Sequence, residues 1–118
     1  MTTGHQIESE IVAKGKTAPR ITPADVQANI VSEHYFRAGD AAYPGQDTVP
    51  DAHNILQLLT FCVLVLQNGF TVTGESACVS FENFDAEIGK KIARQNAEQK
   101  IWALMGYALK KHLHDATK

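Results

Sequence analysis

The residues best suited to chemistry are concentrated between Asn68 and Lys91, in the run NGFTVTGESACVSFENFDAEIGKK. After the opening turn this run carries hydroxyls, a thiol and carboxylates, at Thr71, Thr73, Glu75, Ser76, Cys78, Ser80 and Glu82. Such side chains can act as nucleophiles or general acids, or they can hold a ligand by hydrogen bonds without changing it. The pattern around them has to decide between an enzyme and a binding protein.

The signals for catalysis are weak. The segment TGESAC lacks the second glycine of a nucleophile elbow, and the residues after Ser76 continue a strand pattern. The 5 histidines are scattered and form no i, i+4 pair on a helix, so a catalytic metal is not indicated. We therefore predict no catalytic residue, no metal and no cofactor, and we expect the protein not to be an enzyme. A small hydrolase of nucleotide messengers would require Glu75 or Ser76 for turnover.

A binding site for an anion is better supported. Lys90 and Arg94 stand one helical turn apart, and two cations at this spacing can clamp a phosphate. Because they lie away from the apolar stripe of their helix, we expect them to face solvent or a partner. Aromatic rings and an amide just before the helix can stack on a base and read its edge. The candidate ligand-binding residues are Phe81, Asn83, Phe84, Lys90 and Arg94. The simpler alternatives are a solvated helix face for the cations and core packing for Phe84.

The first third of the chain predicts short helices within about residues 5–32. Gly15 suits the end of the first helix, and Thr22 followed by Pro23 suits the start of the second. Residues 38–54 are rich in Gly, Pro, Asp and Ala, which indicates a loop.

A hairpin at about residues 56–79 is the clearest local signal. Asn68 and Gly69 lie between two strand-like runs, as in a two-residue type I′ turn. The resulting register pairs Val65 with Val72, Cys62 with Glu75 and Leu59 with Cys78. The first strand of the hairpin is apolar on both faces, so we expect it to be central, with the run EHYFR at 33–37 as a third strand beside it.

The region at about residues 81–114 predicts a long helix or a helical hairpin. It carries two apolar stripes that point in different directions: one of Phe84, Ile88 and Ile92, the other of Ile101, Leu104, Met105, Ala108 and Leu109. Either the helix bends between them or one stripe packs on a partner. The fold class expected is α+β, with short N-terminal helices, a small antiparallel sheet and a C-terminal helical region that mediates oligomerisation.

Bulk composition narrows the classes of partner. A chain of 118 residues fits a single domain, 1–118, and a formal net charge of -2 argues against wrapping duplex nucleic acid. The longest apolar run, LLTFCVLVL, is too short to span a bilayer, and the first ten residues lack the apolar core of a secretory signal. We expect a cytoplasmic protein without membrane contacts.

Several segments together resemble a family of small phage proteins that includes the Thoeris anti-defence sponges. They are TAPRITPADV, SEHYF, the run from LLTFCVLVLQNGF through GKKIARQNA, and KIWALMGYALKKHL, so the resemblance extends from about Ile7 to Leu113. NGFTVTGESAC followed by ENFDAEIGKKIA is its most specific part. One departure is at Phe81, where relatives often have proline.

The resemblance implies a function that composition alone does not. It implies a protein of the infected bacterium's cytoplasm that sequesters glycocyclic ADP-ribose, the messenger of Thoeris defence, without cleaving it. It also implies self-association as dimers and hexamers, and a second site for cyclic oligonucleotides of CBASS defence, for which Arg37 and Lys110 are the candidates. The alternative function is an accessory protein that docks on a host or phage protein through its apolar sheet face.

Overall fold

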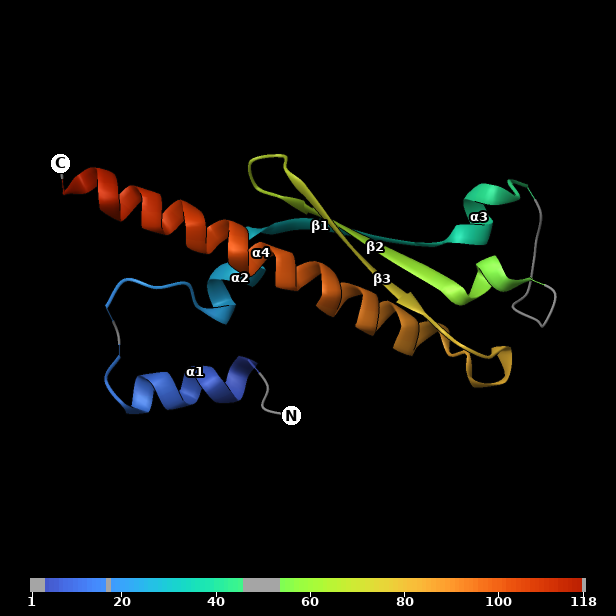
Figure 1. Cartoon of the computed structure of the whole chain (residues 1–118), viewed down its shortest axis with the longest axis horizontal. Coiled ribbons are helices and arrows are strands. Elements are labelled where there is room, and N and C mark those ends of the chain that lie inside the picture. The colour runs from blue at the N-terminus through green and yellow to red at the C-terminus, as the bar shows by residue number, and fades with distance from the viewer. Residues whose placement is uncertain (1–3, 17, 46–53, 118) are drawn as a thin grey trace. The chain divides into compact units, whose positions relative to one another are not determined.

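The computed structural model describes residues 4–16, 18–45 and 54–117. In chain order it contains α1 (Gly4–Ala13), α2 (Pro23–Asn29), β1 (Ile30–Arg37), α3 (Ala38–Ala42), the 3-10 turn η1 (Ile55–Leu58), β2 (Leu59–Leu66), β3 (Thr71–Ala77), the 3-10 turn η2 (Phe81–Asn83) and α4 (Ala86–Ala116) (Figure 1). These elements confirm the α+β class. They fall into two compact units, one of residues 1–29 with 101–118 and the other of residues 30–100.

In the first unit, α1 ends and α2 begins where the sequence predicts. Gly15 has a φ of 69° and its amide donates to the carbonyl of Val12, which ends α1. At the start of α2 the Thr22 hydroxyl accepts from the Asp25 amide, and the Asp25 carboxylate accepts from the Thr22 amide. Val26 is the buried residue of this helix.

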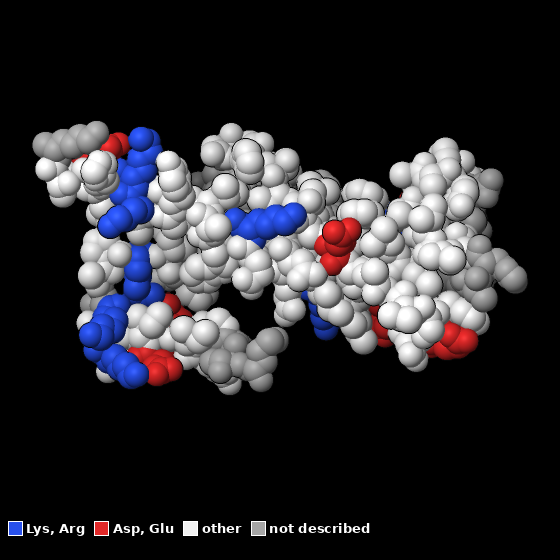
Figure 2. Space-filling model, in the orientation of Figure 1, with Lys and Arg blue, Asp and Glu red and all other residues white. Residues whose placement is uncertain are grey.

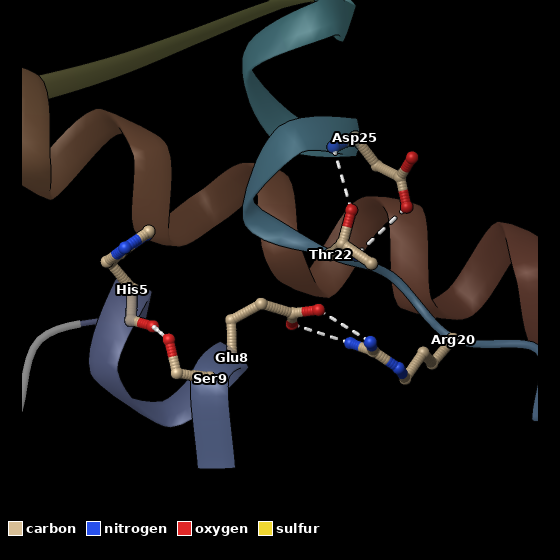
Figure 3. Close-up of polar contacts among 6 residues, drawn as sticks. All are labelled: His5, Glu8, Ser9, Arg20, Thr22 and Asp25. Atoms are coloured by element: carbon tan, nitrogen blue, oxygen red, sulfur yellow. Dashed lines mark hydrogen bonds and ion pairs between the residues drawn. The ribbon is translucent and has the colours of Figure 1, made fainter. Parts of the chain in front are cut away.

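An ion pair ties α1 to the segment before α2. Both guanidinium nitrogens at the end of Arg20 donate to the Glu8 carboxylate, at 2.6 and 2.5 Å (Figure 3). This bidentate bond lowers the pKa of Glu8. It fixes the approach of the chain to α2.

The second unit is built on a three-stranded antiparallel sheet in the order β1-β2-β3. The run EHYFR lies in β1 beside β2, which confirms the predicted third strand and the central place of the doubly apolar strand. The strand starts earlier than expected, however. Ile30 and Val31 were predicted on a helix and instead open β1, because two β-branched residues in succession suit a strand better than a helix end.

The hairpin turn is one residue longer than predicted. A type I′ turn needs positive φ at both central positions, and no non-glycine residue in the described ranges has it; Gly69, at 87°, does. The Gly69 amide donates to the Leu66 carbonyl, and the Leu66 amide donates to the Phe70 carbonyl, so the loop comprises residues 67–69. The Asn68 side chain accepts from the Phe70 amide at 2.9 Å.

The longer turn changes the register. The pairs are Leu59 with Ala77, Cys62 with Gly74 and Leu64 with Val72, each one residue short of the predicted partner. A slip of one residue moves a strand's side chains to the opposite face, so Val72 projects on the side of Leu64 and not on the side of Val65, its predicted partner. Cys62, Leu64 and Val72 share the buried face, whereas Thr71, Thr73 and Glu75 are exposed.

The helix α4 covers the buried face as a single element of 31 residues, so the helical hairpin does not form. It approaches the sheet closely at Gly74, where an added Cβ would lie 2.2 Å from the Ala93 carbonyl oxygen and 2.3 Å from the Ala97 amide nitrogen. The Asn96 amide also donates to the Glu75 carbonyl at 2.7 Å. The first of the two predicted stripes is therefore wrong: Ala93 and Ala97 are fully buried, while Ile88 and Ile92 are exposed. Small residues take the contact because the backbones meet there. In the second stripe Ile101 is fully buried and Leu104 is exposed.

The predicted loop at 38–54 is helical at its start. Ala38–Ala42 form α3, and the Asp40 carboxylate accepts from the Arg37 amide at 2.8 Å, which stabilises its first turn. Residues 46–53 of that prediction lie outside the described residues.

Candidate functional site

A row of three polar residues crosses the sheet beneath the first turns of α4. Thr60 on the central strand pairs with Arg37 of β1 on one side and with Ser76 of β3 on the other. Cross-strand partners project from the same face, so the three side chains belong to the face that α4 covers. The helix begins above this row because the Asp85 carboxylate accepts from the amides of Glu87 and Ile88.

A first cavity of about 330 Å³ opens on the β1 side of Thr60. Its walls come from β1, β2, α3 and the start of α4: Tyr35, Phe36, Arg37, Asp40, Thr60, Phe84, Ala86 and Lys90. The Lys90 ammonium lies 5.8 Å from the centre of the Tyr35 ring, a cation–π distance. The Arg37 guanidinium lies 3.8 Å from Asp40, a loose contact that leaves donors for another anion. The cavity thus combines two cations with aromatic walls.

Lys90 is exposed, in line with the expectation that the two cations face solvent or a partner, although its ammonium also reaches the Tyr35 ring; Arg94 is half-buried against the sheet. Their direction follows from the buried stripe, which is made by the alanines and not by the isoleucines. The Arg94 guanidinium donates to Glu33 at 2.6 Å and also pairs with Glu98 on the next turn. A phosphate would have to compete with these two carboxylates, so the ligand role of Arg94 stays a prediction.

Burial raises the pKa values of two groups near Lys90 and Arg94, the Tyr35 phenol and the Cys62 thiol. Desolvation raises the pKa of Tyr35 to about 12, with further contributions from Cys62 and Glu33. Desolvation also raises the pKa of the Cys62 thiol. Both groups are therefore neutral near pH 7, and the positive charge of Lys90 has no anionic phenolate or thiolate below it.

A second cavity, also of about 330 Å³, opens on the β3 side of Thr60. Its walls are Leu58, Thr60, Ser76, Ala77, Cys78, Val79, Ser80, Asn83, Phe84, Asp85, Ile88, Gly89 and Ile92. Hydroxyls, an amide and apolar groups predominate, and no Lys or Arg is among these residues. The Asn83 amide donates to the Ser80 hydroxyl at 3.2 Å, which holds it at the cavity wall.

The structure brings together some of the predicted residues and separates others. Lys90, Phe84 and Arg37 line the first cavity, although Arg37 was assigned to a different site. Asn83 and Phe84 line the second. Phe81 lies in η2 and is not among the wall residues of either cavity.

Lys110 lies in the first unit, on the C-terminal part of α4. That unit is rich in basic residues, at Lys14, Lys16, Arg20, Lys110 and Lys111. Figure 2 shows lysine and arginine side chains gathered over the end of α4 and the segment after α1. The predicted pairing of Lys110 with Arg37 in one site stays a prediction.

Two site residues were missed from the sequence, Tyr35 and Thr60. Tyr35 lies in a run that was assigned as a strand, and its alternation could have placed it on the helix side. Thr60 is a lone polar residue in an otherwise apolar strand, and a hydroxyl in such a position is a recognisable signal for a polar partner.

Glu75 and Ser76, either of which a hydrolase would require, project to opposite faces of β3. Ser76 lines the second cavity, whereas Glu75 is exposed, because successive strand residues project to opposite faces. Across the described ranges, no three His, Cys, Asp or Glu side chains gather as metal ligands.

Comparison with known families matches residues 21–113 to the phage protein (N4 Gp49/phage Sf6 gene 66) family. The chain belongs to this family. The match covers β1, the hairpin and most of α4, and so includes all residues of both cavities. No curated protein matches this phage protein, and no solved structure does. None of the helices formed by its described residues carries an apolar stretch long enough to span a bilayer.

Proposed function

We propose that this phage protein sequesters a cyclic nucleotide of the ADP-ribose class in the cytoplasm of the infected cell and releases it unchanged. The observation that carries the proposal is the first cavity, where Lys90 and Arg37 supply positive charge beside the rings of Tyr35 and Phe84. A phosphate needs such cations, and a base or ribose needs such walls. The sequence resemblance to the Thoeris sponges supports glycocyclic ADP-ribose as the ligand.

Calorimetric titration with glycocyclic ADP-ribose tests this function. A sponge has to bind below the level at which the messenger activates its effector, so we expect a dissociation constant on the order of nanomolar. Heating the complex should return the messenger intact. Lys111→Ala is the control for lost charge, since Lys111 is exposed and its partner Asp115 lies on the next turn of the same helix. Recovery of a cleaved product, or no binding, would contradict sequestration.

The proposal includes self-association, for which exposed apolar residues provide the support. Val79 is 100% exposed, Ile88 55% and Ile92 42%, and all three border the second cavity. A contact with a second copy would remove this apolar surface from water. Native mass spectrometry should show dimers and a hexamer, and Ile88→Asp should shift them toward the single chain. Titration with cyclic tri-adenylate, before and after the first ligand, tests the second site.

The alternative function, docking on another protein, has one observation of its own. On the face of the sheet away from α4, Phe36 and Phe61 stack with ring centres 5.3 Å apart, and Phe36 is 41% exposed. Exposed stacked rings are typical of contact surfaces. A single chain that ignores cyclic nucleotides and needs a different protein to form a complex would favour docking over sequestration.

A further inference from the structure

The two cavities meet at the same pair of residues, Thr60 and Phe84, which line both. Each cavity alone lies at the lower end of the 300–1,000 Å³ that is typical of ligand sites, and the two together reach the middle of that range. Their chemistry is complementary. The β1 side has the cations, and the β3 side has hydroxyls and an amide.

Thr60 is the polar group at the meeting point. Its residue is 4% exposed, and it lines both cavities. A hydroxyl at the wall of a cavity can both donate a hydrogen bond to a ligand and accept one from it. It is not crowded out by the helix, because the residue above it is Gly89: an added Cβ there would lie 3.2 Å from the Thr60 oxygen.

We infer that the two cavities form one divided site, in which the ligand lies across Thr60 and its phosphates and nucleoside occupy opposite sides. The inference rests on the proposed function for the identity of the ligand. Lys90 and Arg37 hold the phosphates, while Ser76 and Asn83 face the neutral nucleoside. The Thr60 hydroxyl hydrogen-bonds the part of the ligand that joins them, and Gly89 leaves the space for that part.

If the two cavities bind different parts of one ligand, those parts should bind independently when they are supplied as separate molecules. Adenosine and pyrophosphate should bind to the wild-type protein at the same time, each without changing the dissociation constant of the other by more than about twofold. Glycocyclic ADP-ribose should displace both. Phosphorus NMR reports pyrophosphate, and ligand-observed proton NMR reports adenosine.

Variants of Thr60 test the shared hydroxyl. Thr60→Val keeps the side-chain volume and should weaken glycocyclic ADP-ribose about tenfold, as expected for one lost hydrogen bond. Thr60→Ser should stay within about threefold of the wild type, and Gly89→Ala should weaken binding because it crowds the hydroxyl. Thr71→Val, the same change at an exposed position on β3, is the matched control. Thermal unfolding of each variant separates binding from folding.

The outcomes separate this inference from the proposed function. If the wild type binds glycocyclic ADP-ribose but Thr60→Val binds it equally well, or adenosine displaces pyrophosphate, the divided site is wrong and sequestration stands. If adenosine and pyrophosphate bind together through Thr60 while the cyclic messenger does not bind, the divided site stands and its proposed ligand is wrong. If none of the three compounds binds, both are overturned.

Discussion

The middle of α4 and its first turns meet the same sheet in two different ways. In the middle, Ala93 and Ala97 lie against Gly74 so closely that the backbones touch. At the first turns, Gly89 stands above Thr60 with a cavity on each side, and Lys90 lines one of them. We call the first region, where Ala93 and Ala97 pack on Gly74, the closed contact. We call the second region, at Gly89 and Lys90, the open end, because cavities remain between the helix and the sheet. Close packing and open cavities are thus separated along one helix.

The closed contact should show the largest effect on stability. Gly74→Ala places a Cβ against backbone atoms that have no room to move, so we expect the free energy of unfolding to fall by about 3 kcal/mol. Gly106→Ala is the matched control, because nothing lies within 4 Å of an added Cβ there, and alanine favours a helix by up to about 1 kcal/mol. Urea unfolding measures both. Equal stability of the two variants would show that α4 is not seated on Gly74.

The open end should show its largest effect on binding. Lys90→Ala removes a charged donor from the first cavity, and we expect the binding free energy for glycocyclic ADP-ribose to weaken by roughly 1.5–3 kcal/mol. Its stability should change little, because the Lys90 ion pair with Glu87 is long, at 3.8 Å. Calorimetry and urea unfolding of the same sample check the two expectations. Unchanged affinity would remove Lys90 from the site.

Arg94 lies between the two regions and tests where the boundary falls. Its bonds to Glu33 and Glu98 predict that Arg94→Ala lowers the free energy of unfolding by about 1 kcal/mol. If Arg94 only positions the helix, affinity should fall much less than for Lys90→Ala. A loss of roughly 1.5–3 kcal/mol in binding would instead give Arg94 the phosphate contact that its spacing to Lys90 suggests.

The smallest effect is expected at high pH. The pKa of Tyr35 is raised from 10.0 to about 12 in the folded protein, so its contribution to stability is complete below pH 10 and is lost as the pH rises toward 12. Tyr35→Phe should flatten this part of the stability profile. Tyr107→Phe, at a side chain that is 74% exposed, is the control. A profile that Tyr35→Phe leaves as steep as the wild type would mean that Tyr35 is not desolvated.

The fold was largely predictable because its signals are local. Thr22 with Pro23, and the doubly apolar run before Asn68, each determine a nearby backbone choice. The register of the hairpin was not predictable in this way, because Asn68 and Gly69 suit both a two-residue and a three-residue loop. The choice between the two loops depends on how Val72 and Gly74 pack under α4. The same packing decides which face of α4 is buried, and therefore where Lys90 and Arg94 point. Thr60 and Tyr35 were missed for this reason: their importance comes from the helix that crosses them.

The most direct test of the open end as the ligand site is a nuclear magnetic resonance titration of the labelled protein with glycocyclic ADP-ribose. We expect the largest amide shift changes at Thr60, Phe84 and Lys90, with small changes at Gly74 and Ala97. Changes confined to the closed contact, or a spectrum that the messenger leaves unaltered, would contradict a binding site at the first turns of α4.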